Sequence, residues 1–138
     1  MEQVRVRRGN SKIAGERGEE IVAGFLERCG YVVVVQNWRC RHLEIDIIAV
    51  KGDTVHFVEV KLLSSNKVAE PYEKVGQIKR SRIIDAANGF LNSRRWYSFL
   101  CRFGLSSNFE VSFDVASVVG CGDSFTVDFF ENAYSPLW

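Results

Sequence analysis

One short stretch of the chain, LEIDIIAVKGDTVHFVEVKL at 43–62, carries carboxylates and a lysine at a spacing that could hold a divalent cation. It reads as two apolar strands joined by a two-residue Gly-Asp turn, which is a strong hairpin signal. In the antiparallel register that this turn sets, Asp46 faces Glu59, and Glu44 faces Lys61.

The carboxylates of Asp46 and Glu59 would repel each other in that register. Directly opposed side chains have Cβ atoms about 4.5–5.5 Å apart. Two carboxylates about 4 Å apart repel by roughly 4 kcal/mol at an effective dielectric constant near 20. A divalent cation beside Lys61 would offset this repulsion. The alternative is that the end of the hairpin frays into solvent and the acids are simply hydrated.

The elements around the hairpin must position these groups. Because the opposite face of the hairpin is almost wholly apolar, we expect both of its faces to be covered. A helix from about Ser11 to Cys29, ended by Gly30, has an apolar stripe at helical spacing and turns Glu19 toward the surface on which it packs. The alternative is that Glu19 lies at the margin of the stripe and points outward.

The β-branched run at 31–36 predicts a first strand, which leads through the polar segment NWRCRH at 37–42 into the hairpin. A second helix is predicted from Pro71. Its apolar stripe consists of Val75, Ile78, Ile83, Ala86, Ala87, Phe90 and Leu91.

The last third of the chain is harder to assign. Residues 93–108 either prolong the second helix or form another short one. Two late strands are predicted at Glu110–Val119 and Ser124–Phe130, separated by a glycine-rich turn. We expect the tail to pack over the domain through Tyr134 and Trp138.

Length and composition predict one globular domain over residues 1–138, because 46% of the residues are hydrophobic and 25% are charged. No run is apolar enough for a signal peptide or a membrane span. The four cysteines lie far apart with no C-x-x-C pair, which favours buried thiols in a reducing compartment. We therefore expect a cytoplasmic protein that does not bind membranes.

The charge is unevenly distributed although its net value is only +1. Residues 74–102 contain seven basic side chains and one acidic side chain, whereas residues 103–138 contain five acidic side chains and no Lys or Arg. Such asymmetry indicates a basic face that could bind a phosphate backbone. The alternative is an ordinary solvated face.

Five segments together resemble a known family: GERGEEIVAGFLERCGY, NWRCRHLEIDIIAV, VHFVEVK, SFDV and ENAY. In this order and spacing they are similar to the YraN-like predicted bacterial endonucleases, within the PD-(D/E)xK nuclease superfamily that includes Holliday-junction resolvases. The resemblance implies an α/β fold with a restriction-endonuclease-like αβββαβ core, in which helices flank a mixed central sheet. The chain departs from the family pattern at Leu43, at Leu62-Leu63 and at Ser112.

The resemblance also implies phosphodiester hydrolysis that depends on Mg²⁺ or Mn²⁺. Asp46 and Glu59 would be metal ligands, and the Val60 carbonyl would be the remaining ligand that the protein supplies. Lys61 would orient or deprotonate the attacking water, and Glu19 would bind a metal through water or hold a second ion. Glu44 is expected to form a salt bridge or to contact the edge of the substrate.

The expected partner is nucleic acid, most simply branched or double-stranded DNA, with a possible homodimer as in the related resolvases. No base-reading motif is present, which favours an enzyme selective for structure rather than sequence. The residues predicted to contact nucleic acid are Lys79, Arg82, Gln77, Arg39 and Arg17. The alternative function is a non-catalytic nucleic-acid-binding or scaffold domain that retains the nuclease fold.

Overall fold

The computed structural model describes residues 6–7, 11–63, 77–104, 108–121 and 124–134, and of 6–7, 11–17, 77 and 121 it describes the backbone only. The fold is a mixed α/β arrangement compatible with a restriction-endonuclease-like core, as predicted. The elements are β1 (Val6–Arg7), α1 (Ser11–Arg28), β2 (Val32–Cys40), β3 (Leu43–Lys51), β4 (Thr54–Leu63), α3 (Gln77–Leu91), α4 (Arg94–Phe103), β5 (Glu110–Cys121) and β6 (Ser124–Tyr134).

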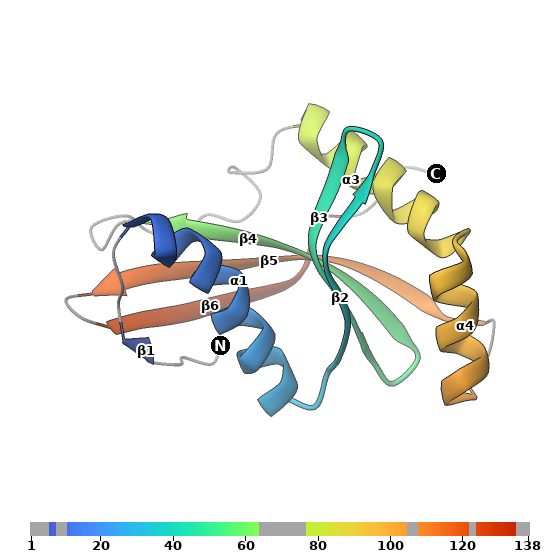
Figure 1. The fold of residues 1–138 in the computed structure, drawn as a ribbon, viewed down its shortest axis with the longest axis horizontal. Helices are drawn as coiled ribbons and strands as arrows, with labels where there is room; N and C mark the ends of the chain where they lie inside the picture. The colour runs from blue at the N-terminus through green and yellow to red at the C-terminus, as the bar shows by residue number, and fades with distance from the viewer. Residues whose placement is uncertain (1–5, 8–10, 64–76, 105–107, 122–123, 135–138) are drawn as a thin grey trace.

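Among the described residues the sheet has six strands in the order β1-β6-β5-β4-β3-β2, with two described residues in β1. β4 and β5 are parallel, while the other neighbours are antiparallel, so the sheet is mixed as expected. In Figure 1, α1 lies in front of the left-hand part of the sheet, and α3 and α4 lie on the right-hand side of the molecule.

Two apolar cores confirm that the central hairpin is covered on both faces. Ile48 and Phe57 belong to a cluster with side chains of α3 and α4, including Phe90 and Trp96. Ile47, Ala49 and Val58 belong to a second cluster with Val22, Phe25 and Leu26 of α1. The alternation of strand side chains therefore separates the two cores.

The predicted register of the hairpin is confirmed from Lys51 opposite Thr54 to Ile47 opposite Val58. Beyond that pair the ladder stops, so the predicted facing of Asp46 with Glu59 and of Glu44 with Lys61 is wrong. The β2–β3 pair diverges from β4 at this point (Figure 1).

The divergence also breaks the alternation along β3. Ile45 and Ile48 lie in the same core cluster. Regular alternation would place two residues that are three positions apart on opposite faces of the strand. The carboxylate of Asp46 instead enters the gap between the strands, where it accepts a hydrogen bond from the Val60 N–H at 2.8 Å. Beyond the last backbone pair, the side chain of Asp46 therefore connects β3 to β4.

Helix α1 approaches β4 closely at Gly18, which is buried. A Cβ at this position would lie 2.6 Å from Cδ1 of Leu62. The neighbouring Glu19 is consequently held near the end of the hairpin, while Glu20 and Glu27 are exposed as expected of surface acids.

Helices α3 and α4 are separate. Ser93 caps α4, because its hydroxyl accepts a hydrogen bond from the Trp96 N–H at 3.3 Å, and Gly104 ends the helix in a left-handed conformation. The predicted α3 stripe is confirmed over 83–91, but Ile78 is 74% exposed because the first turn of α3 overhangs a pocket instead of the core. Pro71 and Val75 lie outside the described residues.

β4 and β5 run one and two residues past their predicted ends, to Leu63 and Cys121, and β2 and β6 extend further. β2 continues to Cys40 because the sequence NWRC pairs with the start of β3, and its polar side chains are tolerated on an edge strand. β6 continues to Tyr134, which pairs with Phe113, so ENAY is part of the sheet and not a tail packed over it. Trp138 lies outside the described residues.

Within the described part of the chain, no helix is both long and apolar enough to cross a lipid bilayer.

Candidate functional site

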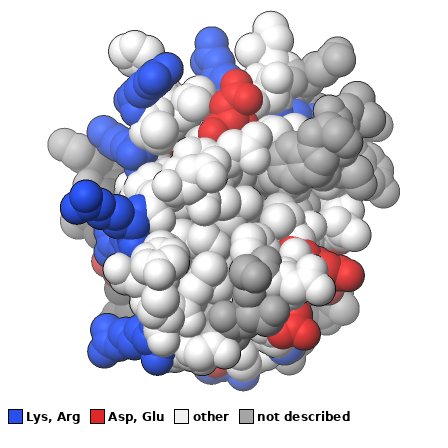
Figure 2. All heavy atoms as spheres, turned by 90° about the vertical axis from the view of Figure 1, so that its right-hand side faces the viewer, with Lys and Arg blue, Asp and Glu red and all other residues white. Residues whose placement is uncertain are grey.

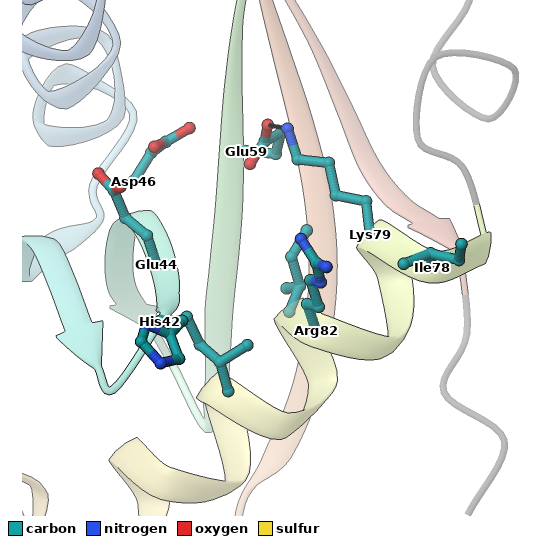
Figure 3. A pocket seen from close by; sticks show the side chains of 9 residues that line it. His42, Glu44, Asp46, Glu59, Ile78, Lys79 and Arg82 are labelled. Atoms are coloured by element: carbon teal, nitrogen blue, oxygen red, sulfur yellow. Dashed lines mark hydrogen bonds and ion pairs between the residues drawn. The ribbon is translucent and has the colours of Figure 1, made fainter.

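A pocket of about 590 Å³ opens where β3 separates from β4, and the first two turns of α3 form its opposite wall. Figure 3 shows Glu44 and Asp46 on one side of the pocket and Lys79 and Arg82 on the other. The lining residues are His42, Leu43, Glu44, Asp46, Glu59, Ile78, Lys79, Arg82 and Ile83.

Three carboxylates meet beside this pocket. Oxygen atoms of Glu19, Glu44 and Asp46 all lie within 4.8 Å of one another. Glu19 comes from α1, and the other two acids are adjacent on one side of β3, so only the packing of α1 at Gly18 unites them. The expectation that Glu19 points toward the sheet is confirmed.

Glu59 lies on β4 at the back of the pocket and is buried, with 8% of the residue exposed. Its carboxylate forms an ion pair with the Lys79 ammonium, which reaches across from α3 (Figure 3). The lysine thus supplies the positive charge that a buried carboxylate requires. The divalent cation expected near Glu59 stays a prediction, and the Lys79 ammonium is the positively charged group that contacts Glu59 in this structure.

The pKa of Asp46 is raised to about 7. Burial is the largest cause, followed by the negative charge of Glu59, and the hydrogen bond from the Val60 N–H opposes the shift. The charges of Glu19 and Glu44 raise the value further. The negative charge of Asp46 is therefore opposed first by burial and then by its acidic neighbours.

The pKa of Glu19 is also raised, mainly by burial and in part by the charges of Glu44 and Glu59. A side-chain hydrogen bond with Asn37 lowers it. Asn37 belongs to the polar end of β2 and has a positive φ of 54°, a backbone conformation that asparagine tolerates better than most residues. The extension of β2 thus places an amide next to the acidic cluster.

The donor set of this cluster fits a hard divalent cation. Oxygen ligands are what Mg²⁺ and Mn²⁺ take in proteins, with water in the remaining positions. Carboxylates whose ionisation is opposed by burial and by one another are the groups that a cation would stabilise. Glu19, Glu44 and Asp46 could hold such an ion directly, and Glu59 could join them if Lys79 moved away.

The other predicted site residues are placed as follows. Lys61 is half-buried on β4, two residues beyond Glu59 and hence on the same side of that strand, but is not among the described residues that line the pocket. Lys79 and Arg82 line the pocket. Arg39 is exposed and lies 3.8 Å from Glu44, which confirms a salt bridge for that acid. The side chains of Arg17 and Gln77 lie outside the described residues.

Two residues of the site were not singled out as ligands from the sequence. Glu44 belongs to the carboxylate cluster in addition to its salt bridge. His42 lines the pocket from the turn between β2 and β3. The available signal was the two-residue spacing of Glu44 and Asp46, which keeps both on one side of a strand.

Replacing Lys79 by Ala should lower the free energy of unfolding by about 1–2 kcal/mol. Removing one partner of a buried ion pair costs about 3–5 kcal/mol, and the half-exposed lysine reduces that value through solvent screening. Urea denaturation at neutral pH measures the loss. A Lys79→Arg variant, which keeps the positive charge, should recover most of it; an unchanged Lys79→Ala protein would argue against the ion pair.

Comparisons with known proteins identify relatives along most of the chain. A family model described as "Uncharacterised protein family UPF0102" matches residues 18–118. A "UPF0102 protein" of Syntrophus aciditrophicus is 40% identical over 124 residues, covering 87% of this chain and 90% of its own length. One from Clostridium perfringens is 38% identical over 111 residues, covering 75% of this chain and 91% of its own. The family match includes Glu19, Asp46 and Glu59, and the chain belongs to the uncharacterised protein family UPF0102.

Proposed function

We propose that the protein is a metal-dependent endonuclease that hydrolyses phosphodiester bonds in DNA. The observation that carries the proposal is the convergence of three carboxylates on an open pocket whose far wall carries Lys79 and Arg82. Acids on one side and bases on the other would place a phosphate next to a bound cation. The resemblance to YraN-like and PD-(D/E)xK nucleases supports the same assignment.

Asp46 and Glu59 would hold Mg²⁺ or Mn²⁺ together with the Val60 carbonyl, and Glu19 and Glu44 would bind directly or through water. When bound, such a cation supplies Lewis-acid stabilisation of the negative charge that develops on a phosphate. For Glu59 to take part, Lys79 must leave its carboxylate. The released ammonium would then be available to a phosphate oxygen of the substrate.

Lys61 would act on the attacking water. From β4 its ammonium would orient that water, help to remove its proton and stabilise charge on the phosphate. Arg82 would bind a neighbouring phosphate with its planar guanidinium.

Exposed bases extend beyond the pocket. On α3 and α4 they are Lys79, Arg82, Arg94, Arg95 and Arg102. Figure 2 views the molecule from the right-hand side of Figure 1, where α4 lies, and shows Lys and Arg side chains gathered along one edge. A DNA backbone following that edge would be held without base-specific contacts. This favours double-stranded or branched DNA as the substrate, and a homodimer would enlarge the contact surface.

The proposal includes a cytoplasmic location. Within the part of the chain that the structure describes, Cys40 and Cys101 are free thiols, which fits a reducing compartment.

A non-catalytic nucleic-acid-binding domain is the second candidate, and the Lys79–Glu59 ion pair favours it. This pair balances the charge of one predicted ligand, Glu59, with a side chain of the same protein, an arrangement that does not depend on catalysis. Both functions predict salt-sensitive binding to DNA, so binding cannot separate them.

Cleavage assays separate the two functions. Wild type and Lys61→Ala are incubated with labelled duplex, flap, four-way-junction and single-stranded DNA, and with RNA, in Mg²⁺ or Mn²⁺. We expect wild type to cut at least one DNA structure and the variant to cut it about 100-fold more slowly.

Lys51→Ala is the matched control, because Lys51 is an exposed lysine of the same hairpin at the opposite end from the pocket. It should cut like wild type. Absence of cleavage by wild type on every substrate, or equal cleavage by Lys61→Ala, would reject the nuclease in favour of the binding domain.

A further inference from the structure

A second polar cluster lies away from the candidate active site, on the side of the sheet that α1 covers. At its centre is His56 of β4, which shares a strand side with Val58 of the α1 core. Only 3% of the His56 side chain is exposed, and its Nδ1 lies 2.6 Å from Oδ2 of the fully buried Asp114. The proposed nuclease site does not use this buried histidine.

Hydrogen bonds to Asp114 decide which nitrogen of His56 carries the proton. Oδ1 of Asp114 accepts hydrogen bonds from Ser112 Oγ at 2.5 Å and from the Asn132 N–H at 2.9 Å. Because an ionised carboxylate only accepts hydrogen bonds, we assign the proton between His56 Nδ1 and Asp114 Oδ2 to the histidine, which donates it. Nε2 on the opposite edge of the ring is therefore the nitrogen available to another group.

That group is a carboxylate. Nε2 of His56 lies 3.9 Å from Oε1 of Glu131, whose side chain is 61% exposed and also accepts a hydrogen bond from Tyr31 at 3.4 Å. A separation of 3.9 Å is too long for a hydrogen bond. Two ligands of one tetrahedral Zn²⁺ lie about 3.4 Å apart, since Zn²⁺ binds nitrogen at about 2.0–2.1 Å and carboxylate oxygen at about 2.0–2.2 Å. A small rotation of the exposed Glu131 side chain would shorten the 3.9 Å distance to that separation.

The two atoms meet at a pocket of about 250 Å³, which has room for an ion and several waters. Its walls also include Glu110 and Thr54, and none of the described residues that line it is a lysine or an arginine. The Lys51 ammonium lies over the neighbouring Tyr31 ring, 4.9 Å from its centroid, and is not part of the pocket wall. The charged side chains of the wall other than His56 are therefore acidic, as a cation requires.

We infer that His56 Nε2 and Glu131 Oε1 form a second metal site, for a divalent transition metal such as Zn²⁺. The Asp114–His56 pair matches the arrangement in which a carboxylate orients a ligating histidine through its other nitrogen. Water completes the coordination. A bound ion would link β4 to β6 and stabilise that edge of the fold.

The ligand chemistry distinguishes this site from the candidate active site. Imidazole with carboxylate suits Zn²⁺, Co²⁺, Ni²⁺ and Cu²⁺, whereas the all-oxygen cluster around Asp46 suits Mg²⁺ and Mn²⁺. The second site therefore stands whether or not the protein is a nuclease.

The test is a Zn²⁺ titration of the full chain in excess Mg²⁺, followed by calorimetry and by ¹⁵N NMR of the imidazole nitrogens. The chain has only two histidines, His42 and His56, so their signals can be separated. We expect one equivalent of Zn²⁺ to shift the Nε2 signal of His56, to leave its Nδ1 protonated and to raise the Tm. Glu131→Gln should weaken Zn²⁺ binding about tenfold or more.

Glu27→Gln, an exposed acid of α1, is the matched control and should bind Zn²⁺ like wild type. Because His56 is buried, its replacement could unfold the domain, so the NMR signal and the Glu131 variant carry the test. An unshifted Nε2 of His56, a response confined to His42, or undiminished binding by Glu131→Gln would each show a metal-free His56–Glu131 contact and overturn the inference.

Discussion

Asp46→Asn should abolish DNA cleavage while making the metal-free protein more stable than wild type. We expect hydrolysis to fall about 1,000-fold or more, because the loss of a direct carboxylate ligand removes several kcal/mol of charge stabilisation by the bound cation. Mn²⁺ should raise the Tm of wild type and leave that of the variant nearly unchanged. Cleavage rates and thermal melts with and without Mn²⁺ measure both effects.

The gain in stability follows from the raised pKa of Asp46. The folded protein binds the Asp46 proton with a pKa of about 7, against 3.8 for the ordinary side chain. Between these values the folded state holds more protons than the unfolded state, so the stability of metal-free wild type falls as the pH rises. The asparagine side chain of the variant cannot ionise, and its oxygen can still accept a hydrogen bond from the Val60 N–H.

The difference in unfolding free energy between variant and wild type should therefore grow from pH 4 to pH 7 and then level off, at about 1–3 kcal/mol. Urea denaturation in the presence of a chelator measures it at each pH. Glu20→Gln, an exposed acid beside Glu19, should show no such trend. A less stable Asp46→Asn protein at pH 8 would mean that Asp46 is not strained by burial and by its acidic neighbours.

Phe90→Ala should lower the free energy of unfolding by about 3–5 kcal/mol. Phe90 of α3 is fully buried, and its ring lies 5.1 Å from that of Trp38, 6.2 Å from that of Phe57 and 5.6 Å from that of Trp96. It thus joins α3 to β2, β4 and α4. Removing it leaves a cavity that rigid neighbours on three elements cannot fill.

Urea denaturation measures this loss, provided that the slope of the unfolding free energy against urea concentration is the same in the variant and in wild type. Tyr97→Ala is the matched control, because Tyr97 is an aromatic residue of α4 that is 69% exposed. It should change stability by about 0.5 kcal/mol or less. A loss below about 1 kcal/mol for Phe90→Ala would mean that α3 is not anchored through this ring, and that the positions of Lys79 and Arg82 depend on other contacts.

The sequence predicted the turn end of the central hairpin accurately, from Lys51–Thr54 to Ile47–Val58, because local rules govern it. The Gly-Asp turn sets the register, and alternating apolar residues on both faces require cover on both faces. The helix that turns Glu19 inward followed from a 3.6-residue period. The sequence did not predict the full lengths of β2 and β6. An edge strand such as β2 can carry polar residues, such as those of NWRC, when its partner supplies the hydrogen bonds.

The sequence by itself determined which acids lie near the end of the hairpin: Asp46 and Glu59 by their positions along the two strands, and Glu19 by helical phase. Only the tertiary structure decided how they meet. The ladder ends at Ile47 and Val58, so Asp46 turns to the Val60 N–H, Glu44 joins Glu19, and Glu59 pairs with Lys79. Strand divergence depends on packing between elements distant in the chain, and no local pattern encodes where a sheet opens.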